Sequence, residues 1–241
     1  MRLSPVIGAL LLACAGAASS AALAQTAVEP PAEHQHMGGR ADHAGSTEGF
    51  HRRFGDAEKW AKEFDKPERD AWQKPEEILD ALRLQSRSLV ADIGAGTGYF
   101  STRIAKRVPE GKVFAADLEP DMVRYLGARA EREHLANLTP VQAHADAANL
   151  PEPVDLVLVV DTYHHIDDRT RYFAALQSSL RPGGRLVIID FKADSPNGPP
   201  AAHRIPPERV ILELTAAGYT LADKIEFLPR QYGLIFKKRD S

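Results

Sequence analysis

Short runs of apolar residues recur along the chain between residues 89 and 190. Uninterrupted runs of this kind are typical of strands buried on both faces of a parallel sheet. The predicted strands lie at 89–93, 113–117, 138–143, 154–160 and 185–190. Between them, apolar residues recur at helical spacing. The alternation predicts an α/β fold, a three-layer sandwich with helices on both faces of a mostly parallel sheet.

The last elements depart from this alternation. A helix is predicted at 208–217 with Gly218 as its stop, and 219–227 and 232–238 have the pattern of a closing antiparallel hairpin. The chain has 241 residues, of which 44% are hydrophobic and 26% charged, as expected for one globular domain with a sizeable core. We expect that domain to span residues 85–241.

A glycine-rich turn interrupts the chain directly after the first predicted strand. Residues 94–98 read Gly-Ala-Gly-Thr-Gly, and a helical pattern follows. Strand, glycine turn and helix let the backbone approach a nucleotide-like ligand, because glycine has no Cβ and tolerates positive φ. Dinucleotide-binding sites use G-x-G-x-x-G, whereas here the spacing is G-x-G-x-G. The simpler alternative is a turn that only packs a helix on a strand.

Acidic residues accompany this turn. Asp92 stands two residues before its first glycine, and Asp117 ends the next predicted strand 25 residues later. That offset is about the one at which a carboxylate reaches a ribose in such folds, and a carboxylate accepts both ribose hydroxyls. A helix-capping role would suit Glu119 or Asp121 better. We therefore interpret Asp117 as a ligand of a ribose.

The run Asp-Ile-Gly-Ala-Gly-Thr-Gly at 92–98 resembles the first motif of the class I S-adenosylmethionine-dependent methyltransferases. In that family the loop wraps the amino-acid end and the ribose of the cofactor. The Leu-Arg-Pro-Gly-Gly turn at 180–184 is a second mark of the family. The resemblance covers residues 84–238 and implies a Rossmann-like methyltransferase fold with seven strands and S-adenosylmethionine as cofactor.

A third segment, 144–151, is similar to the family's G-D-A-x-x-L-P motif, although His144 and Ala145 precede the acid in place of the usual glycine. The resemblance implies that Asp146 meets the adenine amino group and that the next backbone amide meets a ring nitrogen. The cofactor-binding residues that it implies are Asp92, Gly94, Ala95, Gly96, Gly98, Asp117, Leu118, Asp146, Ala147 and Asp161.

The apolar run 154–160 is the expected central strand, and ligands of open parallel sheets bind at carboxyl ends of strands. The residues directly after it, Asp161, Tyr163 and His164, are therefore candidate catalytic residues, and His165 is a candidate substrate contact. A histidine takes a proton from an acceptor near neutral pH. The alternative is that one imidazole packs beneath the loop as a structural group.

A long segment rich in proline and glycine follows the fifth strand, at 191–207. An irregular loop at the ligand end of a sheet is a candidate acceptor-binding element. Its charged and imidazole side chains, Lys192, His203 and Arg204, are predicted substrate contacts. They are equally consistent with solvated surface groups.

Residues 50–84, before the first strand, have a helical pattern of apolar positions. In the family that the chain resembles, such segments often cap the cofactor cleft. Residues 50–84 are thus a predicted N-terminal helical cap, with Trp60, Trp72 and Gln73 as candidate lid residues. Buried aromatic packing is the alternative for these side chains.

The first 24 residues read as a secretory signal peptide cut after Ala24, which predicts a periplasmic or secreted protein. The apolar run is too short for a membrane span. Cys14 lies in a faint lipoprotein-like sequence, so a lipid anchor is the less favoured alternative. Residues 25–49 are predicted to be a disordered tether. Its histidines, at 34, 36 and 43, show no fixed metal-site spacing, so we predict no metal.

The net charge of −3 gives no basic field for nucleic acid. The mature chain would hold no cysteine, so a disulfide or a cysteine nucleophile is excluded.

The predicted function is methyl transfer to a small-molecule acceptor by direct displacement. Export conflicts with the cytoplasmic supply of the cofactor. A non-catalytic exported protein that binds another nucleoside-like ligand is therefore the alternative, and the glycine spacing disfavours a third reading, an NAD-dependent oxidoreductase.

Overall fold

The described part of the chain is residues 54–239 of a computed structural model. The predicted signal peptide, the tether, Cys14 and the histidines of the tether lie outside the described residues. Within 54–239, no helix has the length and apolar character needed to cross a bilayer.

Seven strands of the described residues form one sheet in the order β3-β2-β1-β4-β5-β7-β6. They are β1 (Leu89–Ile93), β2 (Lys112–Asp117), β3 (Leu138–Gln142), β4 (Val154–Val160), β5 (Leu180–Phe191), β6 (Tyr219–Ile225) and β7 (Gln231–Lys238). Strands β1 to β5 pair in parallel, and β7 pairs antiparallel with both β5 and β6. The predicted mostly parallel sheet with an antiparallel C-terminal hairpin is confirmed.

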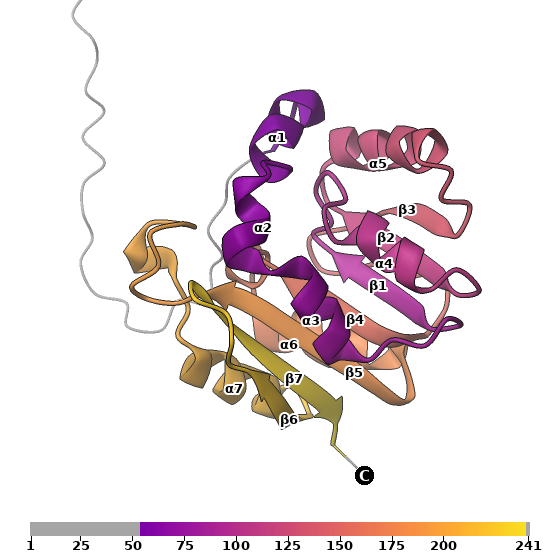
Figure 1. Cartoon of the computed structure of the whole chain (residues 1–241). Coiled ribbons are helices and arrows are strands. Elements are labelled where there is room, and N and C mark those ends of the chain that lie inside the picture. The colour runs from indigo at the N-terminus through magenta and orange to yellow at the C-terminus, as the bar shows by residue number, and fades with distance from the viewer. Residues whose placement is uncertain (1–53, 240–241) are drawn as a thin grey trace, which may run out of the picture. The chain divides into compact units, whose positions relative to one another are not determined.

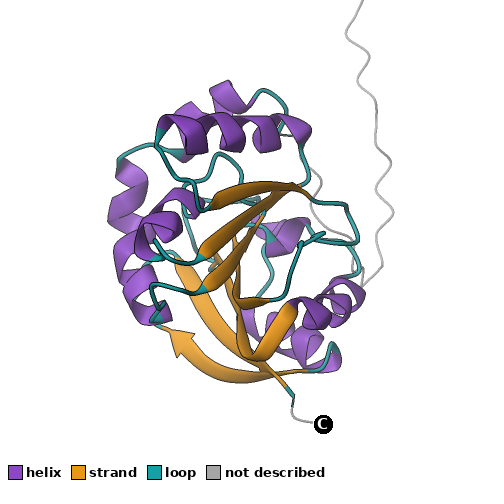
Figure 2. Cartoon of the chain, turned by 90° about the vertical axis from the view of Figure 1, so that its right-hand side faces the viewer, coloured by secondary structure: helices purple, strands orange, loops and turns teal. Residues whose placement is uncertain are grey.

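Helices cover both faces of this sheet (Figures 1 and 2). They are α1 (Ala57–Phe64), α2 (Glu68–Gln73), α3 (Pro75–Leu82), α4 (Ser101–Arg107), α5 (Pro120–Arg132), α6 (Arg169–Leu176) and α7 (Pro207–Ala216). On one face, α3, α4 and α5 pack on alternate residues of the strands, such as Val90 and Leu158. On the other face, α6 and α7 pack on the intervening residues, such as Ala91 and Val157. Because neighbouring side chains of a strand point to opposite faces, each continuous apolar run contributes side chains to two separate cores.

Strand β5 begins earlier than the sequence predicts. The prediction places its start at Arg185, after a turn, whereas Leu180 already pairs with Val154. The register then shifts, so that Arg185 is the next paired residue. Gly183, at φ +74°, lets the intervening residues leave the ladder and return to it. The Pro-Gly-Gly segment is therefore an irregularity inside the strand.

The order of the strands reverses beside β1, which has β2 on one side and β4 on the other. The chain runs outward from β1 to β3 and then crosses to β4. In open α/β sheets, ligands bind outside the carboxyl ends of the strands at such a switch point. The fold thus brings the ends of β1, β2 and β4 together at one edge.

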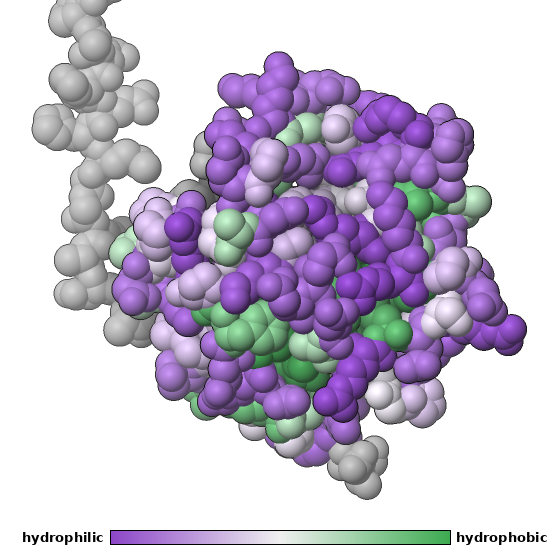
Figure 3. Space-filling model, viewed as in Figure 1, coloured by the Kyte–Doolittle hydropathy of each residue, from purple (hydrophilic) through white to green (hydrophobic). Residues whose placement is uncertain are grey.

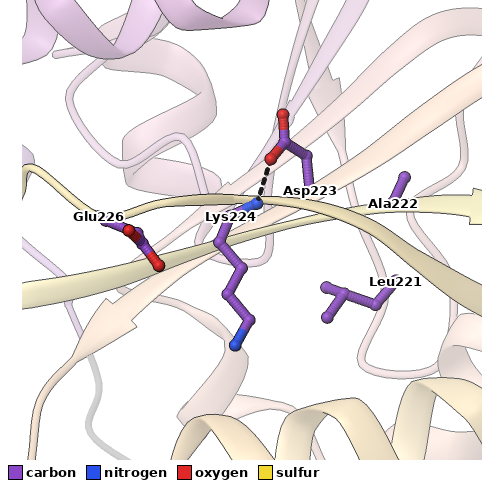
Figure 4. Close-up of a pocket in the computed structure, with 5 residues that line it drawn as sticks. All are labelled: Leu221, Ala222, Asp223, Lys224 and Glu226. Atoms are coloured by element: carbon purple, nitrogen blue, oxygen red, sulfur yellow. Dashed lines mark hydrogen bonds between the residues drawn. The ribbon is translucent and has the colours of Figure 1, made fainter.

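Other surface features lie away from this edge. Hydrophobic residues gather in the lower middle of the face shown in Figure 3, where Figure 1 draws α3 and β7. A shallow hollow of about 380 Å³ lies on the edge strand β6, from Leu221 to Glu226. Figure 4 shows that Asp223, within this hollow, accepts a hydrogen bond from the backbone N–H of Lys224. Three strands separate β6 from β1 in the sheet, so the hollow is not part of the switch point.

Candidate functional site

A cavity of about 1400 Å³ opens at the carboxyl ends of β1, β2 and β4. Ligand pockets in proteins commonly measure about 300–1,000 Å³, so this cavity has room for two small molecules at once. One side is formed by the glycine loop 94–97 and by the ends of β1 and β2. The other side is formed by α1, α2, the residues after β4, and the loop residues 197–200 and 229–230.

The glycine loop is anchored to the neighbouring strand. The amides of Gly94 and Ala95 both donate to the carbonyl oxygen of Ala116, at 2.8 and 3.1 Å. Gly94 and Gly96 have φ of +71° and +56° and line the cavity, which places bare backbone along its wall. Gly98 does not line it. A Cβ at Gly98 would lie 2.8 Å from a methyl group of Leu126 on α5, so this glycine serves helix packing instead of the predicted cofactor contact.

Asp117 closes this loop from the end of β2. Its Oδ2 accepts a hydrogen bond from the Gly96 amide at 2.7 Å, and its Oδ1 accepts one from the Glu119 amide at 2.9 Å. Burial raises the pKa of Asp117, and these backbone hydrogen bonds oppose that shift. Each carboxylate oxygen keeps a further lone pair, so the side chain can still accept hydrogen bonds from a ligand. Its neighbour Leu118 also lines the cavity and is 54% exposed.

Asp92 lies deeper, at the end of β1, and is 3% exposed. Its Oδ2 accepts a hydrogen bond of 2.6 Å from the Ser101 hydroxyl at the start of α4. Burial raises the pKa of Asp92 to about 6. A buried carboxyl of this kind at a cavity wall favours a ligand that brings positive charge or hydrogen-bond donors.

Asp161, directly after β4, joins the cap to the sheet. Its Oδ2 accepts hydrogen bonds from Gln73 Nε2 at 3.1 Å and from Arg69 Nη2 at 3.4 Å, and its Oδ1 accepts one from Gln231 on β7. Burial raises the pKa of Asp161 to about 6, although the Arg69 charge opposes the shift. The guanidinium of Arg69 also lies 4.0 Å from the ring centroid of Tyr99.

Arg69 and Gln231 were not predicted from the sequence. They belong to segments without a recognisable motif, and only the pairing of the cap with β4 and β7 brings them to Asp161. Of the predicted lid residues, Gln73 is fully buried in this network, whereas Trp60 and Trp72 line the cavity. The helical pattern at 50–84 thus corresponds to α1, α2 and α3, two of which help to enclose the cavity.

His164 lines the cavity and forms a buried pair with Asp190 of β5. Its Nδ1 lies 2.9 Å from each oxygen of the Asp190 carboxylate, and the two residues are 4% and 2% exposed. Burial lowers the pKa of His164, but the charge and hydrogen bond of Asp190 outweigh it and raise the pKa above its ordinary value. His165 also lines the cavity, with its ring centroid 4.3 Å from that of His164.

Tyr163 is a correction to the predicted catalytic set. It is fully buried in the core between the sheet and helices α6 and α7, and its hydroxyl donates to Glu213 at 2.7 Å. The same carboxylate accepts a hydrogen bond from Arg169 at 2.8 Å. Residues 163–165 form a 3₁₀ turn, in which successive side chains point in different directions, so His164 faces the cavity and Tyr163 faces away.

The predicted substrate contacts of the loop after β5 are a second correction, because none of the three lines the cavity. Lys192 donates to the Leu228 carbonyl at 2.7 Å, and Arg204 donates to backbone carbonyls of its own loop, including that of Pro199 at 3.0 Å. His203 is exposed outside the cavity. The loop instead contributes its segment 197–200, which Arg204 holds in place.

The segment predicted to meet the adenine is only partly at the cavity. His144 and Ala145 line it, whereas Asp146 is exposed and, with Ala147, lies beyond the lining. The Ala147 amide, predicted to meet an adenine nitrogen, donates to the His144 carbonyl at 3.2 Å. Asp146 and Ala147 thus follow directly after the lining residues, and their contact with an adenine stays a prediction.

Aromatic side chains form part of the cavity wall. Ring centroids lie 6.1 Å apart for Trp72 and Phe191, and 6.3 Å apart for Phe191 and His164. On the other side, Phe54 lies 5.5 Å from His165 and 5.0 Å from Trp60. We call this set, together with Phe64, the aromatic belt. It comes from Phe54, α1, α2, β5 and the residues after β4, so it exists only in the folded chain.

Comparison with known proteins agrees with this geometry. A family model described as a methyltransferase domain matches residues 90–184, from β1 into β5. Over 101 residues the chain is 36% identical to a malonyl-[acyl-carrier protein] O-methyltransferase of Hahella chejuensis, covering 41% of this chain and 34% of that protein. Over 117 residues it is 31% identical to a ubiquinone/menaquinone biosynthesis C-methyltransferase of the same organism, covering 47% of each. The chain thus spans less than half the length of these curated relatives.

Among solved structures, a SAM-dependent methyltransferase from Aquifex aeolicus is similar over most of the fold. The TM-score is 0.70 and the sequence identity 27%, and the match covers 76% of this chain and 98% of that one. The similarity therefore extends beyond the segment that the family model matches.

Proposed function

We propose that the chain is a class I S-adenosylmethionine-dependent methyltransferase and that it transfers the methyl group to a small-molecule acceptor held in this cavity. The observation that carries this proposal is the size of the cavity together with its lining. The glycine loop, the carboxyl groups of Asp92 and Asp117, and the aromatic belt all line the same cavity. This lining suits a cofactor and an acceptor that are bound side by side.

The glycine loop and the aspartates at the ends of β1 and β2 fit S-adenosylmethionine. Asp117 is fixed by two backbone amides and retains lone pairs for the ribose hydroxyls. The bare backbone of Gly94 and Gly96 leaves room for the amino-acid end, and the buried carboxyl of Asp92 complements its positive charge. When bound, the cofactor supplies an activated methyl group on a sulfonium, ready for displacement by a nucleophile.

The chain's own contribution is alignment and exclusion of water. Helix α2 is held over the cavity by the hydrogen bonds of Arg69 and Gln73 to Asp161. The belt residues of α1 and α2 add apolar wall to the cavity. Holding two reactants in line and away from water is the main requirement of a displacement whose leaving group is already activated.

Calorimetric titration of the chain from residue 25 onward with S-adenosylmethionine and S-adenosylhomocysteine tests the proposal. We expect both to bind. Asp117→Ala should weaken both by more than about 1 kcal/mol, the usual effect of losing a charge-assisted hydrogen bond. Asp194→Ala, at an exposed aspartate outside the cavity, is the matched control. Absence of binding by the wild type would favour the alternative of a non-catalytic protein that binds another nucleoside-like ligand.

We also propose that the protein is exported, on the strength of the signal-peptide pattern in residues 1–24. N-terminal sequencing of the protein recovered from the periplasmic fraction checks this. A mature chain that begins at Gln25 supports export, and an intact N-terminus in the cytoplasmic fraction contradicts it.

A further inference from the structure

We propose that His164 and Asp190 form a proton-accepting pair for a hydroxyl group, and that the acceptor is a planar aromatic molecule methylated on that oxygen. The inference rests on the proposed methyltransferase function and deepens it by naming the acceptor class. Neither the fold nor the glycine loop requires such a pair, because the methyl group is already activated without it.

The geometry of the pair leaves one ring nitrogen for a ligand. Both oxygens of Asp190 are within 2.9 Å of His164 Nδ1, which fixes the ring and assigns the Nδ1 proton to that contact. Among the described residues, every buried side-chain nitrogen or oxygen has a hydrogen-bond partner, and the ring of His164 bonds only through Nδ1. Nε2 therefore has accessible surface. Because His164 lines the cavity, that surface opens into it.

Two backbone amides hold Asp190 in place. Its Oδ1 accepts a hydrogen bond from the Phe191 amide at 2.8 Å, and its Oδ2 accepts one from the His164 amide at 3.3 Å. The carboxylate is thus fixed on both sides and can orient the imidazole and stabilise its protonated form. Asp190 is a positioning residue, and His164 is the group that would touch the acceptor.

The charged and titratable groups around His164 favour proton uptake. Asp190 on β5 and Asp161 after β4 raise the pKa of His164, whereas burial and Arg169 on α6 lower it. His165 is the adjacent ring of the same turn. The net effect is upward, so the neutral imidazole is a stronger base than an ordinary histidine.

A fixed base points to a hydroxyl acceptor. An uncharged amine attacks with its own lone pair and can lose its proton afterwards, whereas a hydroxyl oxygen is a weak nucleophile until its proton leaves. Asp161, a carboxylate of the cavity wall that interacts electrostatically with His164, is already engaged by Arg69, Gln73 and Gln231, so it is not free to hold an ammonium group.

The aromatic belt indicates the shape of the acceptor. Phe191 and His165 flank His164 directly, and Trp72 and Phe54 continue the belt on either side. Aromatic rings favour stacked or edge-to-face contacts at such spacings, so a phenolic ring fits this wall with its oxygen toward Nε2.

The step balances without a further reactant. The phenol oxygen forms a bond to the methyl carbon as the bond from that carbon to sulfur breaks, and the electron pair of the broken bond stays on sulfur. The phenol proton passes to Nε2 of His164, which becomes an imidazolium. That proton later leaves to water, and the pair returns to its starting state.

A binding experiment with 4-nitrophenol tests the pair apart from turnover, because ionisation of this phenol is read from its absorption. In the presence of S-adenosylhomocysteine, the wild type should bind it and lower its apparent pKa. His164→Gln should abolish the pKa change and retain calorimetric affinity for S-adenosylhomocysteine. Asp190→Asn should reduce the change. His134→Gln, at an exposed histidine outside the cavity, should behave as wild type.

Label transfer from methyl-labelled S-adenosylmethionine completes the test, with catechol and benzylamine as matched probes. Catechol should be methylated, with a rate that rises with pH as His164 loses its proton, and His164→Gln should lower the rate about 10²-fold or more. In Asp190→Asn the pH profile should shift toward lower pH.

The outcomes separate the two proposals. Failure of the wild type to bind S-adenosylhomocysteine would overturn the proposed function itself. The assignment of the pair would be overturned, with the methyltransferase function left standing, if the wild type binds S-adenosylhomocysteine normally and one of three results is found. The apparent pKa of 4-nitrophenol is unchanged on binding, or it changes equally in His164→Gln. The third such result is methyl transfer to benzylamine and not to catechol.

Discussion

Gln73 and Asp161 are 88 residues apart in sequence and are joined by a hydrogen bond of 3.1 Å from Nε2 to Oδ2. The same amide nitrogen lies 3.1 Å from Oε1 of Gln231. A single buried side chain therefore ties the end of α2 to the residue after β4 and to the first residue of β7. These contacts couple the N-terminal cap to the cavity.

Gln73→Ala is expected to lower the free energy of unfolding by about 1–3 kcal/mol, because it removes these hydrogen bonds and leaves buried partners under-satisfied. It should also weaken S-adenosylmethionine binding, since α2 loses an attachment to the cavity wall. Denaturant unfolding and calorimetry measure the two effects. Gln85→Ala, at an exposed glutamine before β1, is the control. A free energy of unfolding equal to that of Gln85→Ala would show that this network does not hold the N-terminal cap on the sheet.

The raised pKa of Asp92 predicts that the free energy of unfolding depends on pH. Burial raises its pKa from 3.8 to about 6, so the folded state prefers the protonated carboxyl. Its stabilising contribution is complete below the unfolded pKa and is lost as the pH rises through about 6, a change of about 3 kcal/mol.

Comparison with Asp92→Asn isolates this effect from that of Asp161, whose pKa is raised to a similar value. From about pH 4 to about pH 8, the wild type should lose stability relative to the variant. Chemical denaturation across this range provides the measurement. A difference in unfolding free energy that stays constant with pH would contradict the raised pKa.

The sequence predicted the sheet, the glycine loop and the position of Asp117 because these depend on local patterns. An apolar run, a glycine spacing and the offset between Asp92 and Asp117 are all readable within a short segment. Asp117 lies at the cavity and accepts a hydrogen bond from the Gly96 amide, and its contact with a ribose stays a prediction.

The remaining features of the site depend on packing between distant segments. Arg69 meets Asp161 across 92 residues, and His164 meets Asp190 across 26. No local pattern states which of many acidic residues a given histidine or arginine will contact. Tyr163 and His164 point in different directions for a similar reason. The direction of each side chain depends on a 3₁₀ turn that the sequence does not specify.

Tyr163→Phe tests the structural role that the fold assigns to this residue. The variant loses the hydrogen bond to Glu213 inside the core, so the free energy of unfolding should fall by about 1 kcal/mol. S-adenosylmethionine affinity should not change, because Tyr163 faces away from the cavity. Thermal unfolding and calorimetry on the same preparation measure both quantities. Weakened cofactor binding with unchanged stability would restore Tyr163 to the site.

Two glycines of the loop should respond differently to alanine. At Gly94, with φ +71°, a Cβ would lie 2.2 Å from Oγ1 of Thr162, so Gly94→Ala must displace the loop or the residues after β4. At Gly96, with φ +56°, the nearest atom to a Cβ is in the Phe64 ring at 3.6 Å, an ordinary contact. We expect Gly94→Ala to destabilise the fold strongly, as measured by thermal unfolding.

Gly96→Ala should fold, with a loss of about 1–2 kcal/mol for holding alanine in the left-handed region. Its effect should fall on binding. The added methyl group lies between the loop and Phe64, which both line the cavity, and takes up space where bare backbone meets the cofactor. Calorimetry should therefore show a loss of S-adenosylmethionine affinity that exceeds the loss of stability. Unchanged affinity in a folded Gly96→Ala variant would mean that the loop only packs α4 on β1, because a backbone in contact with the cofactor cannot accept a side chain at that position without loss.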